Sequence, residues 1–157
     1  MARFYALIAN GGKLVTPHLL LSVEQSVTGG AAPHPAAPAA QQVNVDPAAL
    51  NVVRQGLYEA THSSLGTSSA VFGSFPVAIA GKTGTAEKSV DPGDGIARNF
   101  SQSWWCGYGP YDSPKLVVCA VIENGGHGGT AAAPAALKVF QEFFHQNTTV
   151  QGAIHSD

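Results

Sequence analysis

Apolar and polar residues follow one another along the chain in short blocks that predict three helices. The first block, residues 3–9, is apolar and precedes an Asn-Gly-Gly sequence, which tolerates the left-handed backbone of a helix end. A second helix is predicted from residue 47 to about 59, because Asp46 suits an N-cap and Pro47 suits the first turn. The third helix is predicted over residues 131–145.

Two of these helices have apolar residues at helical spacing, which predicts one face packed on a core. The residues of these two stripes are Leu50, Val53, Leu57, Ala60, Leu137, Phe140 and Phe144. Thr130 is expected to cap the last helix, after a glycine-rich turn over residues 124–129. Both helices are therefore expected to back a sheet.

Strands are predicted where apolar, β-branched and aromatic residues gather. Residues 14–15 and 19–23 suit edge or connecting strands, because a Thr-Pro pair lies between them. A further strand is expected from residue 75 to 87. Residues 104–108 and 116–122 flank a turn with Pro, Asp and Ser, which predicts a β-hairpin. The last of these strands is apolar on both faces, as in a sheet covered on both sides.

Two segments are expected to be loops. The Ala/Pro-rich stretch 28–42 suits neither a helix nor a strand ladder and is predicted to be a mobile surface loop. Residues 90–102 are polar, contain Gly and Pro, and are also predicted to be a loop. The whole chain, 1–157, is thus predicted to be one α+β domain with about three antiparallel strands and two longer helices.

The composition limits the classes of function. Hydrophobic residues make up 45% and charged residues 11%, which is typical of a globular chain. The formal net charge of -2 provides no basic field for phosphate backbones, so nucleic acid is not expected as a partner. No apolar run is long enough to cross a bilayer. No cofactor or metal is expected, because the two cysteines and six histidines lack ligand spacing.

The sequence Lys-Thr-Gly-Thr at residues 82–85 is the candidate site. Lys82 supplies a positive charge, and the hydroxyls of Thr83 and Thr85 can donate hydrogen bonds to a carboxylate. Gly84 has no side chain, so a substrate backbone can lie against the strand. Alone, these four residues are a weak indication, because the same sequence also occurs in surface turns.

Gly81, Lys82 and Thr83 also match the end of a phosphate-binding P-loop. Such a loop needs a glycine five residues before Gly81, and Pro76 stands there instead. Without that glycine the nest of backbone N–H groups cannot form. A nucleotide-binding function is therefore disfavoured.

Four segments together resemble the transpeptidase domain of class B penicillin-binding proteins, of the elongation type. The segments are residues 2–12, 80–87, 104–110 and 123–134, in the order and spacing of the family. Lys-Thr-Gly is one of three signature motifs of penicillin-binding proteins and class A β-lactamases. The resemblance covers most of the chain, except the Ala/Pro loop and the tail after about residue 146, and implies a C-terminal part of such a domain.

The resemblance implies roles for individual residues. Lys82 would hydrogen-bond the serine of the second motif and assist proton transfer. Thr83, Gly84 and Thr85 would bind substrate, with both hydroxyls on the carboxylate of a peptide stem or a β-lactam. The N–H of Thr85 would form half of the oxyanion hole, which gives this residue a catalytic role as well. The implied reaction is D,D-transpeptidation, in which a serine ester of one peptidoglycan stem is attacked by the amine of another.

The chain lacks the other two signature motifs. None of its serines has a lysine three residues later, and no Ser-x-Asn sequence occurs. In the family these motifs lie upstream of the first matching segment, so we expect that the chain begins inside the domain. The nucleophile would then come from the missing N-terminal part, and the isolated fragment would be inactive. The family also implies the cell envelope, at the extracytoplasmic face of the cytoplasmic membrane, with an anchor absent from this soluble fragment.

The expected partners follow from the same resemblance. They are peptidoglycan stem peptides and β-lactams in the complete domain, and the missing N-terminal part itself. In the family that part supplies the strand beside residues 116–122, so this apolar edge would be unpaired here. Self-association through the edge is therefore expected.

Two other functional classes remain open. A serine D,D-carboxypeptidase or β-lactamase would share the Lys-Thr-Gly strand, although residues 123–134 favour the transpeptidase. A non-catalytic binding module or scaffold would need no nucleophile. The sequence upstream of Met1 in the parent gene would distinguish them, because Ser-x-x-Lys there would establish the acyl-transfer enzyme.

Five further residues have structural and functional alternatives. Cys106 and Cys119 would lie opposite each other in the predicted hairpin, where a disulfide is geometrically possible, but two buried thiols are expected. Trp104 and Trp105 point to opposite faces of their strand, so at least one belongs to the core. His127 is expected to be a turn residue rather than a general base.

Overall fold

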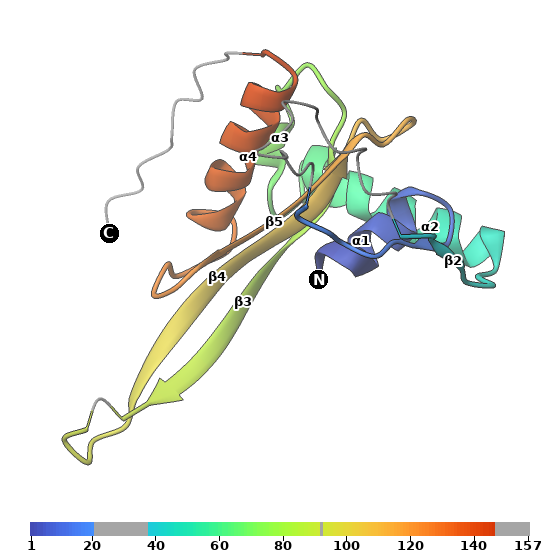
Figure 1. The fold of residues 1–157 in the computed structure, drawn as a ribbon. Helices are drawn as coiled ribbons and strands as arrows, with labels where there is room; N and C mark the ends of the chain where they lie inside the picture. The colour runs from blue at the N-terminus through green and yellow to red at the C-terminus, as the bar shows by residue number, and fades with distance from the viewer. Residues whose placement is uncertain (21–37, 92, 147–157) are drawn as a thin grey trace, which may run out of the picture.

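The computed structural model describes residues 1–20, 38–91 and 93–146. Its centre is a three-stranded antiparallel sheet in the order β3-β4-β5 (Figure 1). The strands are β3 (Ala80–Val90), β4 (Arg98–Gly109) and β5 (Leu116–Ile122). α4 (Ala132–Phe143) packs on one face of the sheet, and α1 (Ala2–Ala9) packs on the other. The predicted α+β class is confirmed.

Each face of the sheet has its own hydrophobic cluster. Trp105 and Phe140 lie in the cluster under α4, and the Trp105 ring stacks on Phe72 at a centroid distance of 4.6 Å. Tyr5 and Tyr108 lie in the cluster under α1. β5 contributes side chains to both clusters, which confirms the prediction of a strand covered on both faces.

The first two helices follow the sequence prediction closely. α1 ends before Asn10 and is followed by glycines with positive φ, 79° at Gly11 and 100° at Gly12. α2 (Pro47–His62) starts after Asp46, whose carboxylate accepts a hydrogen bond from the Ala48 N–H at 3.1 Å. It continues about one turn further than predicted.

One position of the predicted stripe on α2 is wrong. Leu50 and Leu57 pack against the α1 cluster, but Val53 is 46% exposed. Its neighbour Arg54 turns inward instead and donates a hydrogen bond to the Tyr111 carbonyl at 2.7 Å. The spacing of apolar residues shows which face of a helix is buried but not which residues at its border are buried. A long polar side chain such as Arg54 can cover an aromatic surface in place of an aliphatic side chain.

The strand predicted from residue 75 starts later. Residues 75–79 form bends and irregular backbone, and β3 begins at Ala80. A short helix that was not predicted, α3 (Ser69–Phe72), precedes this segment and buries Val71 and Phe72. Phe75 and Ile79 are buried although they are not in a strand. Their apolar side chains therefore gave the segment the sequence pattern of a buried strand.

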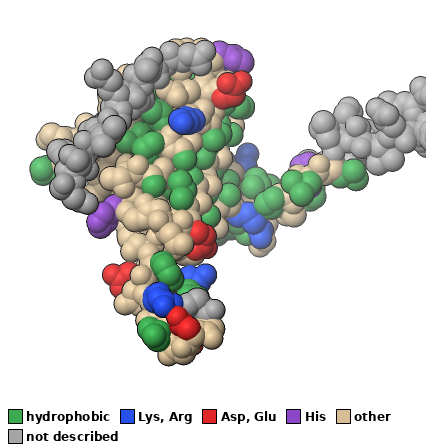
Figure 2. All heavy atoms as spheres, turned by 90° about the vertical axis from the view of Figure 1, so that its left-hand side faces the viewer, with side chains coloured by type: hydrophobic (Ala, Val, Ile, Leu, Met, Phe, Trp, Pro, Cys, Tyr) green, Lys and Arg blue, Asp and Glu red, His purple; other side chains and the backbone are tan. Residues whose placement is uncertain are grey.

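The loop predicted over residues 90–102 is largely wrong. β3 runs to Val90 and β4 starts at Arg98, so the two strands form a hairpin arm that projects from the helices (Figure 1). Charged side chains of both signs gather at its tip (Figure 2), where Arg98 pairs with Asp94 at 2.6 Å. Both faces of the arm are largely exposed, so its sequence has no apolar alternation that would predict strands.

The remaining differences concern short segments. Most of the predicted loop 28–42 lies outside the described residues, but Gln41–Gln42 forms β2, which pairs with β1 (Lys13–Leu14). Of the strand predicted over 19–23, only residues 19–20 are described, and they are not in a strand. The N-cap of α4 is Ala131 rather than Thr130, because the Thr130 hydroxyl donates to the His127 carbonyl at 2.9 Å.

Candidate functional site

The Lys-Thr-Gly-Thr sequence lies within β3, at the edge of the sheet. Lys82 is paired with Cys106 of β4, and Thr83 is paired with Trp105. Because side chains alternate along a strand, Lys82 starts on the α1 face while Thr83 starts on the α4 face. The strand therefore presents its functional groups to two sides of one edge.

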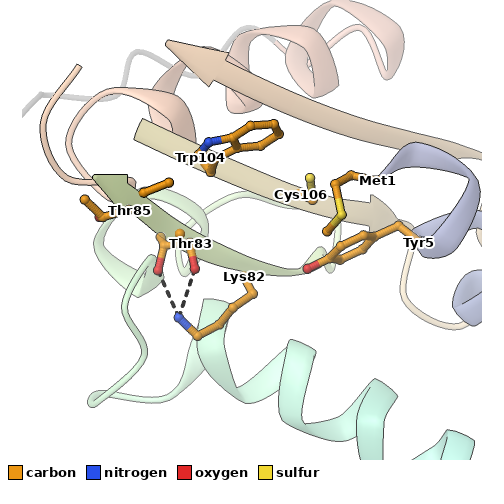
Figure 3. A pocket seen from close by; sticks show the side chains of 9 residues that line it. Met1, Tyr5, Lys82, Thr83, Thr85, Trp104 and Cys106 are labelled. Atoms are coloured by element: carbon orange, nitrogen blue, oxygen red, sulfur yellow. Dashed lines mark hydrogen bonds between the residues drawn. The ribbon is translucent and has the colours of Figure 1, made fainter. Parts of the chain in front are cut away.

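Lys82 bends over this edge to the other side. Its Nζ donates to Thr83 Oγ1 at 3.0 Å and to the Thr83 carbonyl at 3.2 Å (Figure 3). It also donates to Thr67 Oγ1 at 3.1 Å, and the Thr83 hydroxyl donates to the same oxygen at 2.8 Å. A charged ammonium and two hydroxyls thus meet at one exposed point, a combination that suits an anionic oxygen ligand.

Thr85 is separate from this group. Its hydroxyl accepts a hydrogen bond from the backbone N–H of Gly128 at 3.4 Å. Gly128 lies so close to β3 that a Cβ there would come within 2.6 Å of the Gly84 carbonyl. The glycine-rich turn after β5 therefore lies against the candidate strand at Gly84 and Thr85, while Lys82 and Thr83 meet Thr67 instead.

A cavity of about 360 Å³ lies beside the strand (Figure 3). Its polar wall is residues 82–85, and its apolar wall is formed by Met1 and Tyr5 of the N-terminal segment and by Trp104 and Cys106 of β4. Burial raises the pKa of the Tyr5 hydroxyl, which favours the neutral phenol in this wall. The lining is mostly apolar, which suits the apolar part of a ligand, while the Lys82 ammonium lies across the strand edge beside Thr67 and Thr83.

Cys106 and Cys119 are joined by a disulfide, so the expectation of two buried thiols is wrong. They lie directly opposite each other in the β4–β5 register, with a Cα–Cα distance of 4.2 Å, as the predicted hairpin requires. Cysteines that lie directly opposite each other on one face of a hairpin can form a disulfide without any change of the backbone. A preference of cysteine for apolar surroundings does not exclude this bond. The disulfide lies in the same row as Lys82 and forms part of the cavity wall.

The two tryptophans divide as expected. Trp105 is fully buried in the α4 cluster, whereas Trp104 is half-buried and lines the cavity. The hydrogen bonds that hold the turn at His127 involve its backbone, because its carbonyl accepts from the hydroxyls of Ser103 and Thr130. These contacts agree with a turn residue.

The structure also argues against a P-loop. After Gly81, Lys82 and Thr83 the chain continues as a strand to Val90, whereas a P-loop leads into a helix. Within residues 1–20, 38–91 and 93–146, no group of His, Cys, Asp or Glu is arranged to hold a metal ion. None of the helices in this part of the chain has the length and apolarity that a membrane span needs.

Sequence reasoning missed Thr67. It precedes α3 and lies fifteen positions before Lys82 in the sequence. Met1 and Tyr5 were also missed, because contact between the first helix and the strand depends on the tertiary fold. A threonine beside Gly66 gives no local signal of a distant lysine.

The sequence and the fold of the chain place it in a protein family. Residues 1–141 match the family of the penicillin binding protein transpeptidase domain, and the chain belongs to this family. A peptidoglycan D,D-transpeptidase, MrdA of Haemophilus influenzae, is 31% identical over 154 residues, which are 93% of this chain and 23% of that protein. Penicillin-binding protein 2B of Streptococcus pneumoniae is 25% identical over 94% of this chain and 22% of its own length.

Solved structures agree with this assignment. The D,D-transpeptidase domain of a peptidoglycan glycosyltransferase from Eggerthella lenta has a TM-score of 0.69 at 34% identity, covering 91% of this chain and 31% of that one. PBPA of Mycobacterium tuberculosis has a TM-score of 0.64 at 28% identity, covering 89% and 30%. The chain thus spans about a quarter of the length of its curated relatives and about a third of these solved chains.

Proposed function

We propose that this chain is the part of a serine-type D,D-transpeptidase that holds the substrate carboxylate and the acyl group, in an enzyme that cross-links peptidoglycan. The observation that supports it most is the group formed by the Lys82 ammonium and the Thr83 hydroxyl on an edge strand. The curated relatives are named as D,D-transpeptidases and a penicillin-binding protein, which supports the same class over carboxypeptidases and β-lactamases.

The proposed chemistry assigns a step to each group. Lys82 and the hydroxyls of Thr83 and Thr85 bind the carboxylate of a stem peptide or a β-lactam, while Gly84 leaves room for the substrate backbone. The N–H of Thr85 donates to the oxyanion that forms when a serine attacks the penultimate D-Ala carbonyl. The terminal D-Ala leaves, and the amine of a second stem then attacks the acyl-enzyme and releases the serine.

The serine and its lysine base come, in this proposal, from a Ser-x-x-Lys segment elsewhere in the parent polypeptide, since this chain has no such sequence. The isolated chain is then inactive. Binding of a carboxylate to it is weak, because Lys82 is exposed to solvent. The site of action that follows is the extracytoplasmic face of the cytoplasmic membrane, where stem peptides are cross-linked.

Intact mass spectrometry after incubation with benzylpenicillin tests the proposal. The isolated chain should gain no penicilloyl mass, and the parent polypeptide that contains Ser-x-x-Lys should gain one. Lys82→Ala in the parent should slow acylation about 10- to 100-fold, as expected for loss of a charged hydrogen bond. Lys88→Ala is the matched control, because Lys88 is an exposed lysine further along β3.

Two results would contradict the proposal. A penicilloyl adduct on the isolated chain would show that the nucleophile lies within it. An acylation rate in the parent that is the same for Lys82→Ala and Lys88→Ala would remove the role of Lys82.

A further inference from the structure

Thr67, Lys82 and Thr83 form a closed triangle of hydrogen-bonding atoms. The Lys82 Nζ lies 3.1 Å from Thr67 Oγ1 and 3.0 Å from Thr83 Oγ1, and the two hydroxyl oxygens are 2.8 Å apart. Thr67 is exposed, as is Lys82, so a ligand can approach both from solvent. The motif assigns roles to two corners of this triangle and none to the third.

The hydrogens of this group can be counted. A lysine ammonium has three N–H donors, and here they have three acceptors, namely Thr67 Oγ1, Thr83 Oγ1 and the Thr83 carbonyl. The Thr83 hydroxyl hydrogen goes to Thr67. The Thr67 hydroxyl hydrogen has no acceptor among the described residues, so it can bind a ligand without breaking a contact, whereas Lys82 and Thr83 each exchange one of these hydrogen bonds to do so.

The loop that carries Thr67 is firmly held. The next residue, Ser68, is 2% exposed, and its Oγ accepts a hydrogen bond from the Trp105 indole N–H at 3.3 Å. The Ser68 N–H and hydroxyl both donate to the Ala60 carbonyl of α2, at 3.1 and 3.3 Å. Trp105 is also the β4 partner of Thr83. One buried tryptophan therefore fixes both Thr67 and Thr83.

The loop is also packed closely against its neighbours. A Cβ at Gly66 would come within 2.7 Å of the carbonyls of Glu59 and Ala60, and a Cβ at Gly129 would come within 2.9 Å of the Thr67 carbonyl. Only glycine fits at these two contacts without a shift of the backbone. The Thr67 backbone is thus held between α2 and the turn after β5, which preorganises its hydroxyl.

From this geometry we infer that Thr67 is a further residue of the carboxylate site: its oxygen holds Lys82 and Thr83 together, and its hydroxyl hydrogen binds the ligand carboxylate. The inference rests on the proposed function for the identity of the ligand. The hydrogen bonds among Thr67, Lys82 and Thr83 do not depend on the proposed function, because all three residues belong to this chain. Thr67 is a binding and positioning residue and has no part in proton transfer.

The contact is tested on the chain itself by nitrogen-15 NMR of lysine ammonium groups, with Lys82→Arg to assign the Lys82 signal. Thr67→Val keeps the shape of the side chain and removes the hydroxyl, so the Lys82 Nζ signal should shift and exchange faster with water. Thr67→Ser should retain the original signal. Ser64→Ala is the control, because Ser64 is an exposed residue of the same loop outside the triangle. An unchanged Lys82 signal in Thr67→Val would overturn the contact.

The role in binding is tested on the parent polypeptide by acylation kinetics with benzylpenicillin. Thr67→Val should lower the second-order acylation rate constant about 3- to 10-fold, mainly through weaker non-covalent binding, while Thr67→Ser should restore it. The methyl ester of benzylpenicillin has no carboxylate, so the wild type and Thr67→Val should be acylated by the ester at the same rate. A purely structural role of Thr67 would slow both compounds equally.

The two proposals fail in different ways. If Lys82→Ala does not slow acylation, the proposed function fails, and the NMR measurement still decides the contact. If Lys82→Ala slows acylation of the acid but Thr67→Val does not, the inference about Thr67 is wrong and the proposed function stands. Equal melting temperatures of the wild-type chain and Thr67→Val would show that the exposed hydroxyl acts locally.

Discussion

The indole of Trp105 lies directly against Gly81, so that a Cβ at position 81 would overlap the ring. Gly107, two residues beyond Trp105 on β4, touches the same ring, and a Cβ there would also overlap it. The glycine that precedes Lys82 is thus required by packing, because the indole fills the space that a side chain would need. This packing fixes β3 against β4 next to the site.

Gly81→Ala should therefore destabilise the fold by about 1–3 kcal/mol, the usual cost of overpacking a close contact. Gly56→Ala is the matched control, because Gly56 lies inside α2 with open space around its Cα. That change should stabilise the helix by about 0.5–1 kcal/mol. Urea unfolding of both variants measures the difference. A stability of Gly81→Ala equal to that of the wild type would show that the indole can move aside.

Because Cys106 and Cys119 form a disulfide, thiol titration of the oxidised chain in denaturant should find no free thiol. Reduction should lower the free energy of unfolding by about 2–4 kcal/mol, because the reduced unfolded chain is less restricted. The double variant Cys106→Ala with Cys119→Ala should show the lower stability with or without reductant. Two titratable thiols in the untreated chain would contradict this account.

Tyr108 is a buried tyrosine whose hydroxyl has no hydrogen-bond partner among the described residues. Burial raises its pKa, and the nearby Arg54 partly offsets this through its charge and its N–H groups without reaching hydrogen-bond geometry at the oxygen. The folded state therefore favours the neutral phenol. The contribution of the neutral Tyr108 phenol to stability is fully present below the ordinary pKa of 10.0. It should be lost as the pH rises from there through the folded pKa.

Tyr108→Phe should be neutral or stabilise the fold by about 1 kcal/mol at pH 7, because it removes an unpaired buried polar group. It should also reduce the loss of stability above pH 10. Urea unfolding at both pH values measures the two effects. A loss of more than about 1 kcal/mol at pH 7 would show that the hydroxyl has a partner in solution, such as water.

β5 is an edge strand of the described sheet, and Val121 is 47% exposed on it. Pairing of this edge with a second copy should give a species heavier than the 16.1 kDa monomer at high concentration. Val121→Lys should suppress it, because an edge lysine opposes strand addition. Light scattering measures the mass, and Val52→Lys on α2 is a control at another exposed valine. A strictly monomeric wild-type chain would contradict the prediction.

The sequence was sufficient for elements with a strong local signal. The cap at Asp46, the glycines after α1 and the doubly apolar strand β5 each have a direct physical cause in a few adjacent residues. It was insufficient for the arm beyond Glu87, whose strands are held by cross-strand hydrogen bonds rather than burial. α3 was missed because four residues are too few for a helical period.

The same limit applies to the site. Lys82, Thr83 and Thr85 could be chosen because they are adjacent in a motif, although their roles in binding and catalysis remain predictions. Thr67 could not, because its place beside Lys82 depends on the contact between Ser68 and Trp105. The disulfide lay between these cases, since the register was predictable but the bonding state was not.

The β3–β4 ladder is continuous from the pair Ala80 and Tyr108 to the pair Val90 and Arg98. A deletion of one residue within residues 84–90 would therefore have to form a bulge or shift part of the ladder, which would reverse the faces of the shifted side chains. A deletion within the turn between the strands changes no pair. Variation in chain length should thus be tolerated at the tip of the arm and selected against along its strands, although the arm is the most exposed part of the described sheet.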